Sequence, residues 1–185
     1  MEIISKETVW EGSFLRAVKL TYEDNNGSLR KWEAVERVNC EGIVAVVPIT
    51  ADGELILIRQ FRPVVNNYVI EFPAGLNDKG ESLVDAARRE LIEETGQTTE
   101  ELIFLAEGPI SSGLSTEMLT VFLAKGTIPA SPELIKQFPS DESEDIETIR
   151  TPAAVIHNTL ENFRKKGDYV DIKIYGLLEL AKKHL

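Results

Sequence analysis

The chain has 185 residues, 43% of them hydrophobic and 28% charged, so it can bury a core in one domain, with or without an appended arm. Twenty Lys and Arg residues against 31 Asp and Glu residues give a net charge of −11. That charge disfavours non-specific binding to nucleic acid or to a membrane surface, because both need basic patches.

The first 40 residues are expected to form β-strands. The runs FLRAVKLTYED and LRKWEAVERV are rich in β-formers, and the turn signal NNGS separates them. The start of the chain lacks the basic and apolar regions of a signal peptide, and no apolar run approaches the ~20 residues of a membrane span. Cys40 is the single cysteine, which favours a reducing compartment, so the sequence predicts a cytoplasmic protein.

Strands and a helix are expected next along the chain. GIVAVVPIT and ELILIRQF flank ADG and predict a hairpin whose first strand is apolar enough to be central. Pro73 and Gly75 are expected to interrupt the chain before a helix from Ser82 to Thr95, with Gly96 as its C-cap.

The remaining chain alternates between the two kinds of element. LIFLAEG and MLTVFLAKG predict strands, and residues 131–145 are polar, acidic and contain two prolines, which predicts a mobile loop. A strand near 146–150 and two helices, about 152–166 and 171–184, are expected to follow. This order predicts an α+β fold with a mixed sheet between helices.

Acidic residues fall on the apolar face of the expected helix. At about 100° per residue, Glu90 and Glu94 share the face that points inward, and Glu93 lies beside it. The apolar members of that face are Leu83, Ala87 and Leu91.

Buried carboxylates need partners, because the charged form is costly to desolvate. The nearby cations Arg88 and Arg89 lie on other faces of the wheel, so they are not expected to pair with these acids. Carboxylates spaced i, i+4 can converge on one divalent cation. Helical periodicity by itself is compatible both with a metal site and with a solvated helix face.

The spacing around the helix matches a known motif. It resembles the Nudix box, GX5EX7REUXEEXGU, at every fixed position: Gly75, Glu81, Arg89, Glu90, Leu91, Glu93, Glu94 and Gly96. The last position, usually aliphatic, is Gln97, which is a departure at a packing position.

The resemblance implies a Nudix hydrolase with a Nudix-like α/β/α sandwich and a mixed sheet. Such enzymes cleave a nucleoside diphosphate linked to another group X by attack of water at phosphorus, with Mg²⁺ or Mn²⁺. Glu90 and Glu94 would then be direct metal ligands together with the carbonyl of Ala74. Glu93 would bind or orient a further metal or the water, and Arg89 would hold these acids in place. The cation would also explain how an acidic protein takes an anionic substrate.

Segments outside the box resemble the ADP-ribose and nucleotide-sugar pyrophosphatase branch: KWEAVER, LIRQFRP, YVIEFPAGL, GLSTE and DESEDIE. That branch implies a homodimer whose N-terminal antiparallel β arm is exchanged between subunits. Residues 1–40 would be the dimerisation arm and residues 41–185 the Nudix hydrolase domain. The partner would be a small-molecule nucleotide, with no nucleic acid and no membrane.

The branch also implies roles in substrate binding. Trp32 would stack the base and Phe14 would supply a second wall, while Arg37 and Arg62 would bind phosphate with bidentate guanidinium groups. Core packing of Trp32 and a surface ion pair for Arg37 are the alternatives. The branch commonly has Ser-Pro-Gly where residues 111–113 are Ser-Ser-Gly, which leaves room for GDP-mannose or ADP-glucose as substrates.

The general base would come from the DESEDIE segment. Glu142 is the better match, Glu144 is the alternative, and Glu117 would help with metal or water; a merely solvated acidic loop is the competing interpretation. Two other functions remain open. One is a house-cleaning hydrolase of nucleoside triphosphates or dinucleoside polyphosphates, which the N-terminal arm disfavours. The other is a non-catalytic Nudix-fold binding protein, which the complete set of box acids disfavours.

Overall fold

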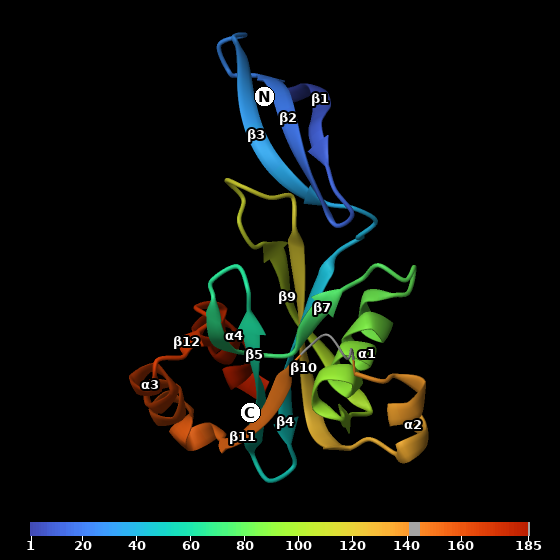
Figure 1. The fold of residues 1–185 in the computed structure, drawn as a ribbon, viewed down its shortest axis with the longest axis vertical. Helices are drawn as coiled ribbons and strands as arrows, with labels where there is room; N and C mark the ends of the chain where they lie inside the picture. Colours follow the sequence, from blue (N-terminus) through green and yellow to red (C-terminus); the bar gives the residue numbers. More distant parts are fainter. Residues whose placement is uncertain (141–144, 185) are drawn as a thin grey trace.

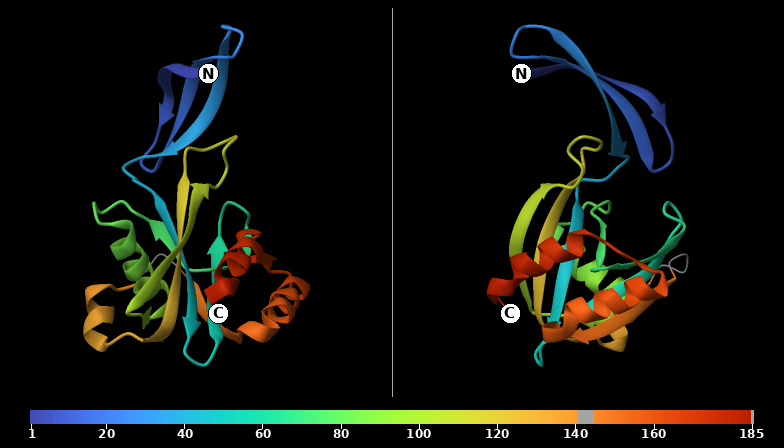
Figure 2. Two further views of the ribbon diagram at one scale, coloured as in Figure 1. Left: turned by 180° about the vertical axis from the view of Figure 1, so that it is seen from behind. Right: turned by 90° about the vertical axis from the view of Figure 1, so that its left-hand side faces the viewer.

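The computed structural model describes residues 1–140 and 145–184 (Figure 1). It contains two sheets, one of three strands and one of nine, here called the arm sheet and the body sheet. The arm sheet stands at one end of the molecule, beyond the described helices (Figure 2). None of these helices is long and apolar enough to cross a membrane.

The arm sheet confirms the predicted strands and turn near the N-terminus. Strands β1 (Glu2–Glu11), β2 (Leu15–Glu23) and β3 (Leu29–Arg37) pair antiparallel in that order. The arm sheet contacts the body at the loop between β9 (Glu101–Pro109) and β10 (Met118–Pro129). The Val35 amide donates to the Leu114 carbonyl at 2.8 Å, and the Thr116 amide donates to the Val35 carbonyl at 3.2 Å.

The body sheet is mixed, as predicted, and runs β12-β6-β5-β4-β10-β8, with β11 on β5, β7 on β4 and β9 on β10. The predicted hairpin forms from β4 (Ile43–Thr50) and β5 (Glu54–Arg62), and β4 is central and also parallel to β10. The other strands are β6 (Asn67–Glu71), β7 (Ala74–Leu76), β8 (Gln97–Thr98), β9 (Glu101–Pro109), β10 (Met118–Pro129), β11 (Ile146–Pro152) and β12 (Tyr169–Val170).

Helices cover both faces of the body sheet. On one face α1 (Leu83–Thr95) packs against Val44 and Val46, while α3 (Ile156–Lys166) and α4 (Lys173–Ala181) pack on the other face, with Ala45 and Val47. Alternate residues of β4 therefore point to opposite layers, as strand geometry requires. The expected α/β/α sandwich with an N-terminal antiparallel arm is confirmed. Short 3₁₀ turns at Ala153–Val155 and Lys182–His184 complete the C-terminal helices.

Local signals set the ends of α1. The Ser82 hydroxyl accepts the Asp85 amide at 3.1 Å, and Gly96 ends the helix with a left-handed φ of 63°. The expected break is present at Pro73, which lies between β6 and β7, but the expectation is wrong for Gly75, because this residue is part of β7 and pairs with Val44 of β4.

The prediction of a loop over residues 131–145 is wrong for its first part. Pro132–Gln137 forms helix α2, because the Ser131 hydroxyl caps the Leu134 amide and a proline is well suited to the first helical turn. Glu142 and Glu144, the predicted bases, lie outside the described residues.

Candidate active site

A cavity of about 740 Å³ lies between α1, the β5–β7 region, α4 and the base of the arm sheet. It brings together residues that are far apart in the sequence. Of the residues predicted to act in the site, the following line it: Phe14, Arg37, Arg62, Ala74, Arg89, Glu90, Glu93, Glu94 and Glu117.

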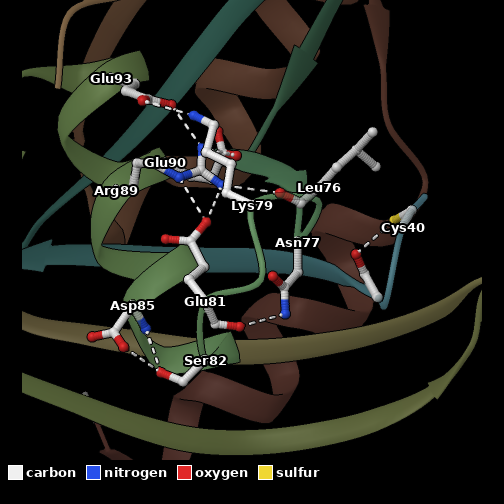
Figure 3. A network of polar contacts seen from close by, with 11 residues as sticks. Cys40, Leu76, Asn77, Lys79, Glu81, Ser82, Asp85, Arg89, Glu90 and Glu93 are labelled. Atoms are coloured by element: carbon white, nitrogen blue, oxygen red, sulfur yellow. Dashed lines mark hydrogen bonds and ion pairs between the residues drawn. The ribbon is translucent and has the colours of Figure 1, made fainter. Parts of the chain in front are cut away.

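One buried guanidinium organises the acidic side of this cavity (Figure 3). Arg89 is 5% exposed, and its Nε donates to Glu81 Oε1 at 2.8 Å. Its Nη1 donates to Glu90 Oε1 at 2.6 Å and to Glu93 Oε2 at 2.8 Å, and its Nη2 donates to the Leu76 carbonyl at 2.9 Å. A single cation therefore holds three carboxylates and the end of β7.

The helical-wheel expectation that Arg89 would not pair with the acids is wrong. An arginine side chain is long enough to curl back over its own helix surface, and i, i+4 partners such as Glu93 are neighbours there. Arg88 behaves as expected and instead donates to the carbonyls of Thr99 and Glu100. Burial lowers the pKa of Arg89, but its hydrogen bonds to Glu81 and Glu93 and the charge of Glu90 outweigh burial, so the pKa is raised and the group stays charged.

The motif glycine is explained by close approach. A Cβ built on Gly75 would lie 1.9 Å from Cδ of Glu90, so the carboxyl group of Glu90 occupies the space of the missing side chain. Next to it, the Ala74 amide donates to Glu94 Oε2 at 2.9 Å. Glu90 and Glu94 are buried, as their place on the apolar face of α1 predicts.

The acidic side chains around Arg89, here called the corner, offer the type of ligand that a divalent cation prefers. Mg²⁺ and Mn²⁺ prefer hard oxygen ligands, and Glu90, Glu93, Glu94 and the backbone at Ala74 bring such oxygens to the lining of this cavity. Among the residues that the structure describes, no three Asp, Glu, His or Cys side chains already surround one point. Instead, Glu90 and Glu93 are turned toward Arg89.

Two further arginines line the cavity, each paired with a carboxylate. Arg37 Nε donates to Glu117 Oε1 at 2.8 Å, and Arg62 Nε donates to Glu71 Oε2 at 2.7 Å. The two readings of Arg37 are thus compatible, because it forms an ion pair and also faces the cavity. Burial raises the pKa of Glu71, and the charge of Asp171 adds to this, while Arg62 opposes it.

The two aromatic candidates differ in position. Phe14, in the turn between β1 and β2, lines the cavity and is 76% exposed. Trp32 is 49% exposed and donates its indole N–H to the Gly113 carbonyl at 3.1 Å, so it is not a core residue, but it does not line this cavity. Its partner loop contains Ser112, the position where the branch usually has proline.

Some lining residues were not predicted. Glu71 stands in the quoted segment YVIEFPAGL, which could have identified it. Asp171, just before α4, and Lys173, its first residue, carried no recognisable signal, because they reach the cavity only through packing. Outside the cavity, Gln97 is buried and accepts a hydrogen bond from Arg150 at 3.0 Å, which accounts for a polar residue where the motif is aliphatic.

Comparisons with known proteins agree with this geometry. The NUDIX domain model matches residues 41–168. The mouse protein named ADP-sugar pyrophosphatase is 34% identical over 197 aligned positions, covering 98% of this chain and 87% of the relative. The Escherichia coli protein named ADP compounds hydrolase NudE is 32% identical over 160 positions, with 86% and 82% covered. A crystal structure of an ADP compounds hydrolase superposes with a TM-score of 0.79 at 28% identity, covering 100% of this chain and 93% of that one.

Proposed function

The chain belongs to the Nudix hydrolase family, and from that premise we propose that it hydrolyses the pyrophosphate bond of a nucleoside diphosphate sugar. The substrate is ADP-ribose or a related compound, and the products are a nucleoside monophosphate and a sugar phosphate. The names of the similar mouse and bacterial proteins support this substrate class.

The observation that carries the proposal is the composition of the cavity. It is lined at once by the acids of α1 and by Arg37 and Arg62, which come from different strands. A diphosphate needs both kinds of group, because planar guanidinium donors fit its oxygens and carboxylates can hold a cation against them. Arg37 and Arg62 are the proposed phosphate ligands, each oriented by its carboxylate partner, Glu117 or Glu71.

Glu90, Glu94 and the carbonyl of Ala74, with Glu93, are the proposed ligands of Mg²⁺ or Mn²⁺. When bound, the ion supplies positive charge that offsets the diphosphate and makes a nearby water more acidic. Arg89 positions the acids, since its guanidinium contacts both Glu90 and Glu93.

Glu142 is proposed to take the proton of the attacking water, with Glu144 as the alternative; the support is the resemblance of DESEDIE to the base segment of the branch. Changing the right residue to Gln should lower kcat by roughly 10²–10⁴-fold and leave KM little changed. If both variants keep more than about a tenth of the activity, Glu93 or Glu117 becomes the leading candidate, because each lines the cavity.

We also propose that two copies of the chain associate through their arm sheets. Every residue of β1 is exposed, and its large apolar side chains include Ile3, Val9 and Trp10. An exposed apolar edge of this kind marks an interaction surface. Trp32, which does not line the cavity of its own chain, is then proposed to stack the base in the composite site.

A substrate panel tests the proposed reaction. ADP-ribose, ADP-glucose, GDP-mannose, dinucleoside polyphosphates and nucleoside triphosphates are incubated with enzyme and Mg²⁺ in ¹⁸O-labelled water, and the products are identified by mass spectrometry. The expected result is a nucleoside monophosphate and a sugar phosphate, one of which carries the label. Hydrolysis of triphosphates or dinucleoside polyphosphates without any nucleotide sugar would replace this function with the house-cleaning alternative.

A further inference from the structure

A second charged cluster lines the same cavity. It adds Asp171 and Lys173, which have no role in the reaction described above, to the proposed phosphate ligand Arg62 and its partner Glu71. It consists of Arg62, Glu71, Asp171 and Lys173, here called the charged quartet. Arg62 and Glu71 come from β5 and β6, Asp171 lies between β12 and α4, and Lys173 is the first residue of α4. The two halves are joined through the backbone, because the Asp171 amide donates to the Ile70 carbonyl at 3.0 Å.

The charged quartet is balanced and preorganised. Arg62 pairs with Glu71 at 2.7 Å, and Lys173 pairs with Asp171, whose other oxygen accepts the Lys173 amide at 2.8 Å. The side chains of Glu71 and Asp171 are mostly buried, whereas those of Arg62 and Lys173 are 38% exposed. The carboxylates are thus held in place, while the two cations keep access to the cavity.

This balance limits the ligand chemistry. Asp171 and Lys173 together add no net charge beside Arg62, so they do not supply the excess of positive charge that a further phosphate would need. An apolar group would cover four charged side chains, and it could not replace the hydrogen bonds that these side chains make to water. A hydroxyl group both donates and accepts, so adjacent hydroxyls of a sugar match cations and carboxylates set side by side.

We infer that Asp171 and Lys173 of the charged quartet hold group X of the substrate, the uncharged sugar, through its hydroxyls, while Arg62, positioned by Glu71, holds the diphosphate. The inference rests on the proposed function. Lys173 and Asp171 are then residues that determine specificity, separate from those that hold the diphosphate.

A second cavity of about 300 Å³ adjoins this place. It shares Lys173, Ile110 and Leu119 with the first cavity and is also lined by Glu107. Lys173 therefore stands where the two spaces meet, and a sugar larger than a pentose has room to extend past it.

The test compares two substrates that differ only in X. ADP-ribose carries a sugar, whereas methyl-ADP carries a methyl group on the same diphosphate. In Lys173→Met the preference in kcat/KM for ADP-ribose over methyl-ADP should fall about tenfold, as expected for loss of a hydrogen bond to a charged group, mainly through the KM for ADP-ribose. Asp171→Asn should shift the preference in the same direction, and Lys173→Arg should retain part of it.

The matched control is Lys165→Met, which removes an exposed lysine of α3 and should leave the preference unchanged. Thermal unfolding of each variant separates a folding defect from a binding one. An unchanged preference in Lys173→Met, or equal losses for both substrates, would overturn the inference while leaving the proposed function standing. If the wild type hydrolyses neither compound, the proposed function fails. The inference is then tested by calorimetry, as the ratio of the Kd values for ADP-ribose and methyl-ADP in the wild type and in Lys173→Met.

Discussion

The cavity corner around Arg89 and the arm sheet break the usual rule of charged residues outside and apolar residues inside, and they do so in opposite ways. In the body, Arg89, Glu90 and Glu94 are charged and buried. In the arm sheet, Val9 and Trp10 are apolar and exposed. Buried charges and exposed apolar patches are the informative exceptions in a folded protein, since each costs free energy unless something binds there.

The two regions differ in what completes them. At the corner, Arg89 contacts Glu81, Glu90 and Glu93, and the Ala74 amide contacts Glu94, so these charged groups have partners within the chain. The apolar side chains of β1 are not buried within the chain, because the arm sheet stands apart from the layers of the body (Figure 2). The first region should therefore respond to mutation as part of the fold, and the second as part of an interface.

The largest expected effect is on stability at the corner. Arg89→Met should lower the free energy of unfolding by about 3–5 kcal/mol, because it leaves buried carboxylates without their cation. Urea denaturation followed by circular dichroism measures the loss. Arg88→Met, which removes only contacts to two carbonyls, is the control and should cost clearly less. Equal losses in the two variants would mean that the contacts of Arg89 with the carboxylates do not stabilise the fold.

Glu94→Gln should separate catalysis from folding at the same corner. Removing a proposed metal ligand should lower kcat/KM with a nucleotide sugar at least 10²-fold, since metal assistance contributes several kcal/mol. The Gln side chain can still accept the Ala74 amide, so the fold should persist in the circular dichroism spectrum. Glu101→Gln, at an exposed position, should leave activity unchanged. Near-wild-type activity of Glu94→Gln at saturating Mg²⁺ would contradict the metal site.

A change in the arm should affect assembly and not folding. Trp10→Ser should raise the Kd of the proposed dimer by about 30-fold or more, as for an aromatic residue that contributes about 2 kcal/mol to an interface. Sedimentation velocity over a range of concentrations measures this, with Glu7→Ser on the same strand as the control. A wild-type protein that is monomeric at micromolar concentration and fully active would contradict the proposed dimer.

The smallest expected effect is a pH dependence from Glu71. Burial raises the pKa of its carboxyl above the ordinary 4.5, so its favourable contribution to stability is present below that pH and is lost as the pH rises through the raised pKa. The free energy of unfolding should be measured for both proteins at about pH 4 and about pH 7. The stability of Glu71→Gln relative to wild type should be greater at the higher pH. Glu147→Gln, at an exposed position, should show no such shift. The opposite trend for Glu71→Gln would mean that Arg62 outweighs burial.

Short-range physics determined much of this protein from its sequence alone. The ends of α1 follow from Ser82 and Gly96, and the burial of Glu90 and Glu94 follows from helical periodicity. The strands of the hairpin around ADG follow in the same way from alternation and turn residues. The prediction failed for α2, because the polar composition of the segment indicated a loop. The capping serine and the first-turn proline, which indicate a helix, were given too little weight.

Only the tertiary structure decided which side chains meet. The sequence could not show that Arg89 would turn onto three carboxylates, because a helical wheel places Cα atoms and not the end of a long side chain. Nor could it bring Lys173 beside Glu71, because the order of the sheet and the packing of α4 place them on one cavity. Capping and periodicity act between residues a few positions apart, whereas the cavity depends on contacts between segments that the chain itself keeps far apart.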